Sequence, residues 1–324
     1  MKSSRSCGGH RIELAASIGD LVNQSNLCHA GCCCGFSAET EPGNLAHNPD
    51  VFSFPECGTL SPLRVPSSGR YRSGMHIRSD IGRQFAWTSE VILVHSSDVH
   101  VDDSRGAAPG RDGTAGLRAV LTTARALDAD LVLLAGDTFE NNQLSASILD
   151  RAGEALAGAG LPIVMLPGNH DPALPDSVFV RGGFSRIPNV RILGVTDDEA
   201  ASFADHDLEI WGHAHRDYFD MAPLRGSRPR STRWQVAMAH GHYEPPETRA
   251  NPLRPSWVFS DEEIAATGAD YLALGHWDRP MRVGNGVVPA YYSGSPELAG
   301  TVNLVRLTAG GEAVVTREAL MTPG

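Results

Sequence analysis

The sequence predicts an α/β fold whose first half contains parallel strands. Three apolar runs, at residues 91–94, 131–135 and 163–166, have the length of buried strands. Two segments between these runs repeat apolar residues with the spacing of an amphipathic helix. The alternation of strands and helices predicts that the three strands lie parallel, joined by right-handed crossovers, and that they end at one edge of a sheet.

The two helical segments are recognised by the periodicity of their apolar residues. In the first segment these recur at i, i+3, i+4, i+7 and i+10, as Leu117, Val120, Leu121, Ala124 and Leu127. The second segment is marked by Ile148, Leu149, Ala152, Ala155 and Leu156. The rest of the chain favours strands, with candidates at Val190–Leu193, Leu208–Trp211, Gln235–Ala239, Tyr271–Leu274, Val287–Tyr292, Val302–Leu307 and Ala313–Arg317.

The composition is that of a globular chain with an acidic balance. Of its 324 residues 41% are hydrophobic, which is enough for a large domain with a substantial core. No apolar run approaches the roughly eighteen residues that a membrane helix requires, so we expect no membrane partner. The net charge of −11 argues against a protein that binds nucleic acid without regard to sequence, although it leaves room for a local basic groove.

Residues 1–88 differ from the rest of the chain. They are rich in Gly, Ser, Pro and Cys, show little apolar periodicity and lack the apolar core of a signal peptide. We expect a disordered extension, or a stretch translated from a start codon placed too far upstream, followed by one domain over residues 89–324. All six cysteines precede residue 58, and the triplet at 32–34 lacks the paired spacing of a zinc site. A main domain without disulfides predicts a cytoplasmic location.

Potential metal ligands follow the predicted strands at the edge where the carboxyl ends should meet. A mixture of carboxylate, imidazole and amide donors suits a pair of divalent ions such as Mn²⁺, Fe²⁺ or Zn²⁺ better than a thiolate site. In two-metal sites a carboxylate can bridge the ions, which together clamp a phosphate and generate a hydroxide nucleophile. The candidate ligands are Asp98, His100, Asp137, Asn169, His240, His276 and Asp278.

Position and charge suggest different roles within this set. Asp137 is the natural bridging ligand because it ends the middle strand in sequence order. Asn169 offers a neutral amide oxygen, which adds no negative charge where an anionic substrate must bind. His170 is then free to protonate a leaving alkoxide, and Asp171 can hold its imidazole.

Five ordered motifs carry these residues, namely Asp98-Val99-His100, Gly136-Asp137, Gly168-Asn169-His170-Asp171, His240 and Gly275-His276. In order and spacing they resemble the calcineurin-like metallophosphoesterase superfamily. Three longer segments, residues 94–100, 136–139 and 292–296, resemble the branch that contains the SbcCD nuclease subunit, a DNA repair exonuclease. The resemblance covers roughly residues 90 to 310.

The resemblance implies a four-layer αββα sandwich in which two mixed β-sheets are flanked by helices. It also implies that His170 is the acid or the histidine that contacts the phosphate. It distributes the ligands as follows: Asp98 and His100 bind the first metal ion, Asp137 bridges, and Asn169, His240 and His276 bind the second.

The chain departs from the family pattern in its last motif. That motif usually reads Gly-His-x-His, but residues 275–278 read Gly-His-Trp-Asp. Asp278 therefore takes the position of a histidine ligand of the first metal ion. A carboxylate there adds negative charge and reduces the Lewis acidity of the metal ions toward a phosphate. The alternative is that Asp278 only pairs with Arg279 or Arg282.

Other histidines compete for the site. His213 and His215 stand in a literal Gly-His-Ala-His pattern, but this pattern precedes His240, out of family order, so we expect a loop pair near the rim. His242 is second choice to His240, which directly follows its strand. Because side chains alternate along a strand, His95 should point away from the site. It is expected to be a structural hydrogen-bonding residue.

The leading hypothesis is an enzyme, a metal-dependent phosphoester hydrolase that uses a dinuclear site and a metal-bound hydroxide. Mn²⁺ is the first choice of metal ion, ahead of Fe²⁺ and Zn²⁺. The substrate stays open between a small phosphodiester or monoester, a nucleotide and a nucleic acid. One alternative is a DNA exonuclease or endonuclease of the SbcCD type. The other is a metallophosphoesterase-like scaffold without catalysis, whose signature would be lost ligands.

Overall fold

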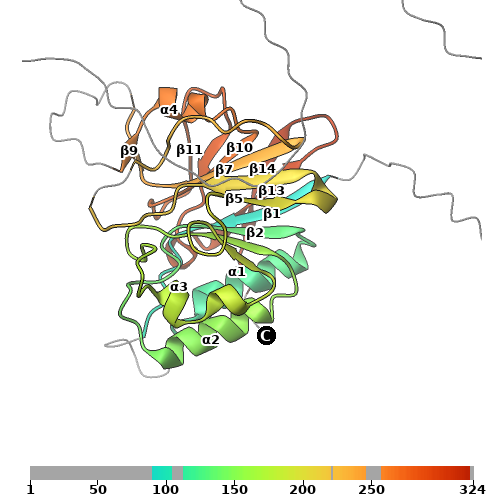
Figure 1. The fold of residues 1–324 in the computed structure, drawn as a ribbon. Helices are drawn as coiled ribbons and strands as arrows, with labels where there is room; N and C mark the ends of the chain where they lie inside the picture. Colours follow the sequence, from blue (N-terminus) through green and yellow to red (C-terminus); the bar gives the residue numbers. More distant parts are fainter. Residues whose placement is uncertain (1–89, 104–111, 220–221, 246–256, 322–324) are drawn as a thin grey trace, which may run out of the picture. The chain divides into compact units, whose positions relative to one another are not determined.

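Two mixed β-sheets pack face to face at the centre of the fold (Figure 1). The computed structural model describes residues 90–103, 112–219, 222–245 and 257–321, all within one compact unit. The extension predicted over residues 1–88 lies outside the described residues. Within the described part of the chain each of the two large sheets has six strands. This confirms the predicted sandwich of two mixed sheets.

The first sheet carries the strand–helix alternation predicted from the sequence. Its spatial order is β14 (Ala313–Ala319), β13 (Thr301–Leu307), β1 (Val91–Ser96), β2 (Leu131–Ala135), β3 (Ile163–Leu166) and β4 (Val190–Ile192). Strands β1 to β4 are parallel, whereas β13 and β14 run antiparallel at the other edge. The register pairs Val94 with Val132 and Leu134 with Met165, so β1, β2 and β3 end at the same edge.

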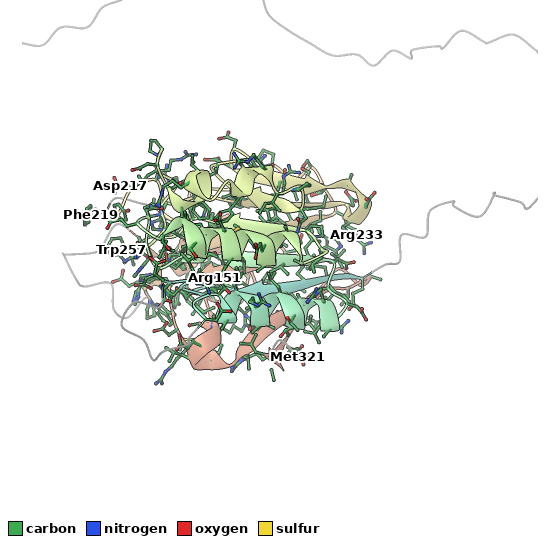
Figure 2. The ribbon with its side chains drawn as sticks, turned by 90° about the horizontal axis from the view of Figure 1, so that it is seen from below. Arg151, Asp217, Phe219, Arg233, Trp257 and Met321 are labelled. Atoms are coloured by element: carbon green, nitrogen blue, oxygen red, sulfur yellow. The ribbon has the colours of Figure 1, made fainter. Side chains whose placement is uncertain are left out.

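Helices α1 (Ala115–Ala126) and α2 (Ala146–Ala157) cover the outer face of this sheet (Figure 1). The predicted apolar stripe of α1 is buried from Leu117 to Ala124, while Leu127 lies just beyond the last turn. Figure 2 views the molecule from this helical side, where Arg151 marks α2. No described helix is both long and apolar enough to cross a membrane.

The second sheet is built from β11 (Met281–Val283), β12 (Ala290–Tyr292), β10 (Tyr271–Gly275), β7 (Trp234–His240), β6 (Leu208–Gly212) and β5 (Ala200–Phe203), in this spatial order. Its four inner strands are parallel, and β5 and β11 are antiparallel edges. The sequence did not predict these two edges, because a short edge strand is defined by its pairing rather than by an apolar pattern. The strand predicted from Val287 starts only at Ala290.

Short elements complete the fold. Ser260 precedes α4 (Asp261–Ala266) and forms a capping box, in which its hydroxyl accepts from the amide of Glu263 and the Glu263 carboxylate accepts from the amide of Ser260. The remaining short elements are α3 (Val178–Arg181), α4 (Asp261–Ala266), α5 (Pro296–Ala299), the 3₁₀ helices η1 (Phe184–Arg186) and η2 (Ala204–His206), and the paired strands β8 (His242–Tyr243) and β9 (Val258–Phe259).

The apolar core lies in three layers, which follow from the alternation of side chains along the strands. On β1, Val94 packs toward the helices and Leu93 packs between the sheets. On β7, Met238 packs between the sheets and Ala237 packs on the outer face of the second sheet. That outer face is covered by the six-residue α4, through Ile264, and by loops rather than by long helices.

His95 is a buried polar link between the two sheets. On β1, its Nδ1 lies 2.8 Å from the hydroxyl of Tyr271 on β10. This confirms the expected structural role of His95. Burial lowers its pKa to about 3, so the side chain is neutral in the folded protein at neutral pH.

We expect the stability linked to His95 to be lost as the pH falls from 6.5 toward 3. Over that range the unfolded chain takes up a proton that the folded protein excludes, so unfolding is favoured at the lower pH by about 1.4 kcal/mol per pH unit at most. His95→Gln keeps a polar group beside Tyr271 but cannot titrate. Urea unfolding in EDTA, from neutral pH to about pH 4, should give a flatter profile for this variant. Identical slopes for variant and wild type would contradict the prediction.

Candidate metal centre

The carboxyl ends of strands from both sheets meet and bring the predicted ligands together. Asp98 and His100 follow β1 and Asp137 follows β2, whereas His240 ends β7 and His276 follows β10. Potential ligand atoms of the first three residues lie within 4.8 Å of one another. Those of Asp137, His240 and His276 do so as well. The site therefore stands at the seam between the two sheets.

The backbone at this seam is held in an unusual conformation. Among the described residues, six that are not glycine have positive φ angles, and four of them are predicted ligands. These are Asp98 (52°), His100 (51°), Asp137 (50°) and His276 (104°). Such conformations cost about 1–3 kcal/mol each and persist only where surrounding contacts impose them, often at functional sites. The strand ends are thus shaped to turn these side chains toward one another.

Asp137, Asn169, His240 and His276 form the more buried half of the centre. Nε2 of His240 lies 3.0 Å from Oδ2 of Asp137 and 3.0 Å from Oδ1 of Asn169. The same amide oxygen lies 3.1 Å from Nδ1 of His276. Nδ1 of His240 faces the carbonyl oxygen of Ala135 at 3.0 Å, and a carbonyl can only accept a hydrogen bond. Nδ1 therefore carries a proton, and Nε2 is the atom aimed at the centre.

Asp98 is held in the other half by its neighbours. The backbone N–H of His276 donates to both carboxylate oxygens, at 3.1 and 3.0 Å. The hydroxyl of Ser97 donates to the same carboxylate and lies 2.9 Å from the hydroxyl of Ser293. Sequence reasoning gave neither serine a role, although both stand in segments quoted for the SbcCD resemblance. Two features could have indicated these serines: Ser97 directly precedes Asp98, and Ser293 directly follows the strand β12.

The electrostatics of the centre fit a divalent cation. Burial, together with the charge of Asp137, raises the pKa of Asp98. Burial also opposes ionisation of Asp137, but the charge and hydrogen bond of His240 outweigh it and lower the pKa of that carboxyl. In turn Asp137 raises the pKa of His240 to about 9 against the effect of burial. A positive charge between the buried carboxylates of Asp98 and Asp137 is therefore favourable. A metal ion can supply this charge in place of a proton on His240.

His276 meets the other requirement for a ligand, a free lone pair. Burial and then the charge of His240 lower its pKa to about 4, so the imidazole is neutral near neutral pH. Asn169 is neutral at every pH and its oxygen already points at both imidazoles. Carboxylate, amide and neutral imidazole donors together suit divalent ions such as Mn²⁺, Fe²⁺ and Zn²⁺.

Asp171 does not hold the imidazole of His170, which corrects the expectation from sequence. Its fully buried carboxylate accepts from the backbone N–H groups of Gly168, at 2.7 Å, and Phe139, at 2.9 Å. It thereby ties the loop after β3 to the loop after β2. Burial, with the charge of Asp137, raises its pKa to about 7. Neighbours in sequence were mistaken for neighbours in space, because successive side chains in this turn point apart.

His170 has a different partner. Its Nδ1 lies 3.0 Å from the backbone carbonyl oxygen of Glu140. Its own backbone N–H donates to Oδ1 of Asp137 at 2.8 Å, and this places its ring beside His100, with ring centroids 4.9 Å apart. The His170 side chain is 42% exposed, so a substrate can reach it.

The family model for the calcineurin-like phosphoesterase matches residues 92–280. This is more than half of the chain, and it includes every predicted metal ligand. The chain belongs to the calcineurin-like phosphoesterase family. No curated protein matches it.

Solved structures with a similar arrangement come from distant proteins. One is TT1561 of Thermus thermophilus, with 12% identity and a TM-score of 0.48 over 72% of this chain and 100% of that chain. Another is a putative 5'-nucleotidase from Staphylococcus aureus in complex with alpha-ketoglutarate, with 13% identity and a TM-score of 0.49. That match covers 73% of this chain and 55% of the other. The family assignment itself rests on the family model.

Asp278 remains the unusual residue of this calcineurin-like phosphoesterase. Its side chain is exposed, and among the described residues no group of potential ligands includes it. Its backbone oxygen accepts from the N–H of Ser295 at 3.1 Å, which anchors the loop after β10 to the start of α5. Within the described residues no ion pair joins Asp278 to Arg279 or Arg282 either. A role for Asp278 as a ligand stays a prediction.

The other histidines take three different positions. His215 is buried behind the centre rather than at its rim, with Nε2 2.8 Å from the carbonyl oxygen of His240. Burial and the charge of His240 lower the pKa of His215 to about 4. His213 points to Glu199, at 3.0 Å. His242 is exposed and accepts from the indole N–H of Trp277 at 2.9 Å. The contact with Asp137 therefore belongs to His240.

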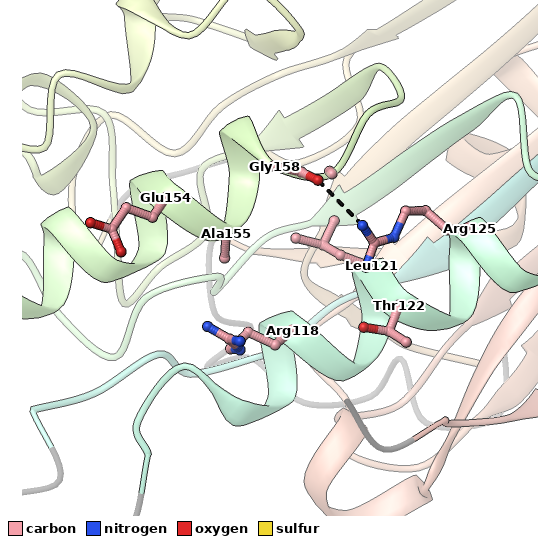
Figure 3. A pocket seen from close by; sticks show the side chains of 8 residues that line it. Arg118, Leu121, Thr122, Arg125, Glu154, Ala155 and Gly158 are labelled. Carbon is pink, nitrogen blue, oxygen red and sulfur yellow. Dashed lines mark hydrogen bonds between the residues drawn. The ribbon is translucent and has the colours of Figure 1, made fainter. Parts of the chain in front are cut away.

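Two cavities lie beside the first sheet of this chain. One of about 330 Å³ lies between α1 and α2 and is lined by Arg118 and Arg125, the latter donating to the carbonyl oxygen of Gly158 at 3.4 Å (Figure 3). It shares no lining residue with the metal centre. The other, of about 360 Å³, has mainly apolar walls and reaches the predicted ligand His100. Of these two cavities, the second is the one that reaches the centre.

Proposed function

We propose that the chain hydrolyses phosphoester bonds with a pair of divalent metal ions, Mn²⁺ in the first place. One observation carries the proposal: Asp137 belongs to two of the three groups of potential ligands found among the described residues. One group adds Asp98 and His100, and the other adds His240 and His276. A buried carboxylate shared by two groups is what a bridging ligand requires.

The residues of the centre divide the work. Bound metal ions would supply Lewis acidity toward the phosphate and lower the pKa of the attacking water. Asn169 would bind without adding negative charge next to an anionic substrate. In its imidazolium form His170 would keep Nδ1–H on the Glu140 carbonyl and donate the proton of Nε2 to the leaving oxygen. The ligands would be Asp98, His100 and Asp137 for one ion, and Asp137, Asn169, His240 and His276 for the other.

Removal of metal ions should abolish turnover. Bis-p-nitrophenyl phosphate is a suitable substrate, because its product is coloured and its leaving group is good. After EDTA treatment we expect no hydrolysis, and titration with Mn²⁺ should restore it with a stoichiometry of two ions per chain by elemental analysis. EDTA saturated with Mn²⁺ beforehand controls for other effects of the chelator. Turnover that survives EDTA, or a single bound ion at full activity, would contradict the dinuclear proposal.

His170→Ala should separate chemistry from metal binding. The variant keeps the backbone N–H that donates to Asp137, so metal content should not change. Loss of a general acid typically costs about 10²–10⁴-fold in rate. The loss should be larger for alkyl phosphoesters than for p-nitrophenyl esters, because a poor leaving group depends more on protonation. His213→Ala serves as control, since that histidine points to Glu199. An equal loss for both kinds of ester would remove the acid role.

A second candidate is DNA cleavage of the SbcCD type. The observation that favours it is the 2.9 Å contact between the hydroxyls of Ser97 and Ser293, which joins two of the segments that resemble that branch. Linear duplex DNA, cyclic nucleotides and simple phosphoesters should be compared at equal Mn²⁺. Hydrolysis confined to small substrates would exclude the nuclease. No turnover on any substrate, with fewer than two bound ions, would instead favour the non-catalytic scaffold. The cytoplasmic location stays a prediction.

A further inference from the structure

Glu140 contacts two histidines of the proposed site with two different groups. It lies just after β2, three residues beyond Asp137. Oε2 of its carboxylate lies 2.9 Å from Nδ1 of His100. Its backbone carbonyl oxygen lies 3.0 Å from Nδ1 of His170. One residue thus reaches a predicted metal ligand through its side chain and the predicted acid through its main chain.

We propose that Glu140 is a positioning residue that sets the ring orientation and tautomer of both His100 and His170. The proposal rests on the proposed function, because it concerns how the same site is prepared for metal ions and substrate. No role for Glu140 was predicted from the sequence. Its carboxylate is not a member of the buried ligand set, since its side chain is 44% exposed.

The effect on His100 follows from the chemistry of imidazole. A neutral ring has one N–H and one lone pair, and a carboxylate beside Nδ1 favours the proton there. The lone pair is then on Nε2, the nitrogen that remains for a metal ion. Carboxylates that orient histidine ligands in this way also increase the basicity of the ligand. The 2.9 Å contact lacks the alignment of a hydrogen bond, and a rotation of the half-exposed Glu140 side chain would be needed to form one.

The shorter contact to His170 comes from the Glu140 main chain, because Oε1 of the carboxylate lies 3.9 Å from Nδ1 of His170 and the backbone oxygen lies 3.0 Å from it. A carbonyl oxygen only accepts hydrogen bonds, so Nδ1 of His170 must carry the proton that it shares with Glu140. Nε2 then faces the substrate side. Because the two rings meet edge to face at 4.9 Å, a change in the orientation of one is felt by the other. Substitutions of Glu140 should therefore disturb His100 directly and leave the tautomer of His170 in place.

The decisive experiment reads the tautomers directly. Long-range ¹H–¹⁵N spectra of the full chain, labelled at histidine and kept metal-free at a pH above the usual histidine range, distinguish Nδ1–H from Nε2–H. His100→Gln and His170→Gln identify the two sets of signals. In wild type we expect both rings as Nδ1–H. In Glu140→Ala we expect His100 as a mixture of tautomers and His170 unchanged. Glu154→Ala, an exposed glutamate on α2, is the matched control.

Metal affinity provides the second measurement. Calorimetric titration with Mn²⁺ should show about 10–100-fold weaker binding at one of two sites in Glu140→Ala, the usual cost of removing such a partner. Glu140→Gln keeps an acceptor of the same length, so it should recover most of the affinity and the Nδ1–H tautomer of His100. It also tests the proposal if Glu140→Ala fails to fold.

Three results have distinct meanings. An unchanged His100 tautomer and unchanged Mn²⁺ affinity in Glu140→Ala would overturn the positioning role while leaving the hydrolase proposal intact. Loss of a third equivalent of Mn²⁺, with two sites unaffected, would overturn it too, because Glu140 would then bind metal itself with His100 and His170. If wild type bound no Mn²⁺ at all, the proposed function would fail, and the tautomer spectra would still decide the contact of Glu140 with His100.

Discussion

Asp137→Asn should eliminate turnover and metal binding together. Asp137 is shared by the group with Asp98 and His100 and the group with His240 and His276, so its loss should weaken the binding of both ions. We expect the rate to fall by more than about a thousandfold, equivalent to roughly 4 kcal/mol of transition-state stabilisation. Asparagine has nearly the same volume, and its amide oxygen can still accept from the backbone N–H of His170. The loss would thus reflect missing charge rather than a collapsed loop.

Elemental analysis and bis-p-nitrophenyl phosphate hydrolysis, carried out on the same preparation, test this expectation. Asp150→Asn is the control, because it is the same substitution at an exposed residue of α2, away from the site. The control should keep two ions and wild-type turnover. An Asp137→Asn protein that still binds two ions would show that another group bridges them. One that keeps a single ion would assign Asp137 to one site alone.

The parts of the fold that were predictable are those whose apolar pattern is strong. Strands β1, β2 and β3 are continuous apolar runs because both faces of the sheet are buried, one under helices and one under the second sheet. Their ends were visible because polar residues follow at once. Edge strands such as Ala200–Phe203 carry no such signal. Their position is set by the neighbouring strand, which sequence patterns do not contain.

The candidate site divides in the same way. Its ligand candidates from Asp98 to His276 could be predicted because their chemistry resides in side chains, and the structure brings them together. The partners of Asp171 and His170 could not, because they are backbone N–H and carbonyl groups that every residue possesses. His215 was placed wrongly for a related reason. Its contact is with the backbone oxygen of His240, and this depends on how β6 and β7 lie side by side.

Gly275→Ala should destabilise the protein by forcing the two sheets apart at the metal centre. Gly275 ends β10 in the second sheet, directly against the end of β2 in the first. A Cβ atom there would collide with the carbonyl oxygen of Ala135 and lie 2.7 Å from Nδ1 of His240. Real Cβ atoms do not approach other atoms within 3.0 Å, and backbone cannot move aside cheaply. Overpacking of this kind costs about 1–3 kcal/mol and occasionally more.

The displaced atoms explain why this small change should also reach the chemistry. The Ala135 oxygen that the new methyl group would push is the one that faces Nδ1 of His240, at 3.0 Å, and so directs Nε2 toward Asp137. We therefore expect thermal unfolding to begin roughly 6–12 °C lower, from a cost of about 3 kcal/mol in a domain of this size. Mn²⁺ affinity should fall in the same variant, because the carbonyl that orients a ligand has moved.

A matched glycine separates this close approach from the general effect of replacing glycine. Gly310→Ala, in the turn between β13 and β14, meets only the hydroxyl of Thr308 at 3.6 Å and should leave both the melting temperature and Mn²⁺ affinity unchanged. Gly136→Ala would probe the same space but adds strain from its φ of 90°, so Gly275 is the cleaner test. If Gly275→Ala had the same melting temperature as wild type, there would be room for a methyl group between the sheets. The orientation of His240 would then not depend on their close approach.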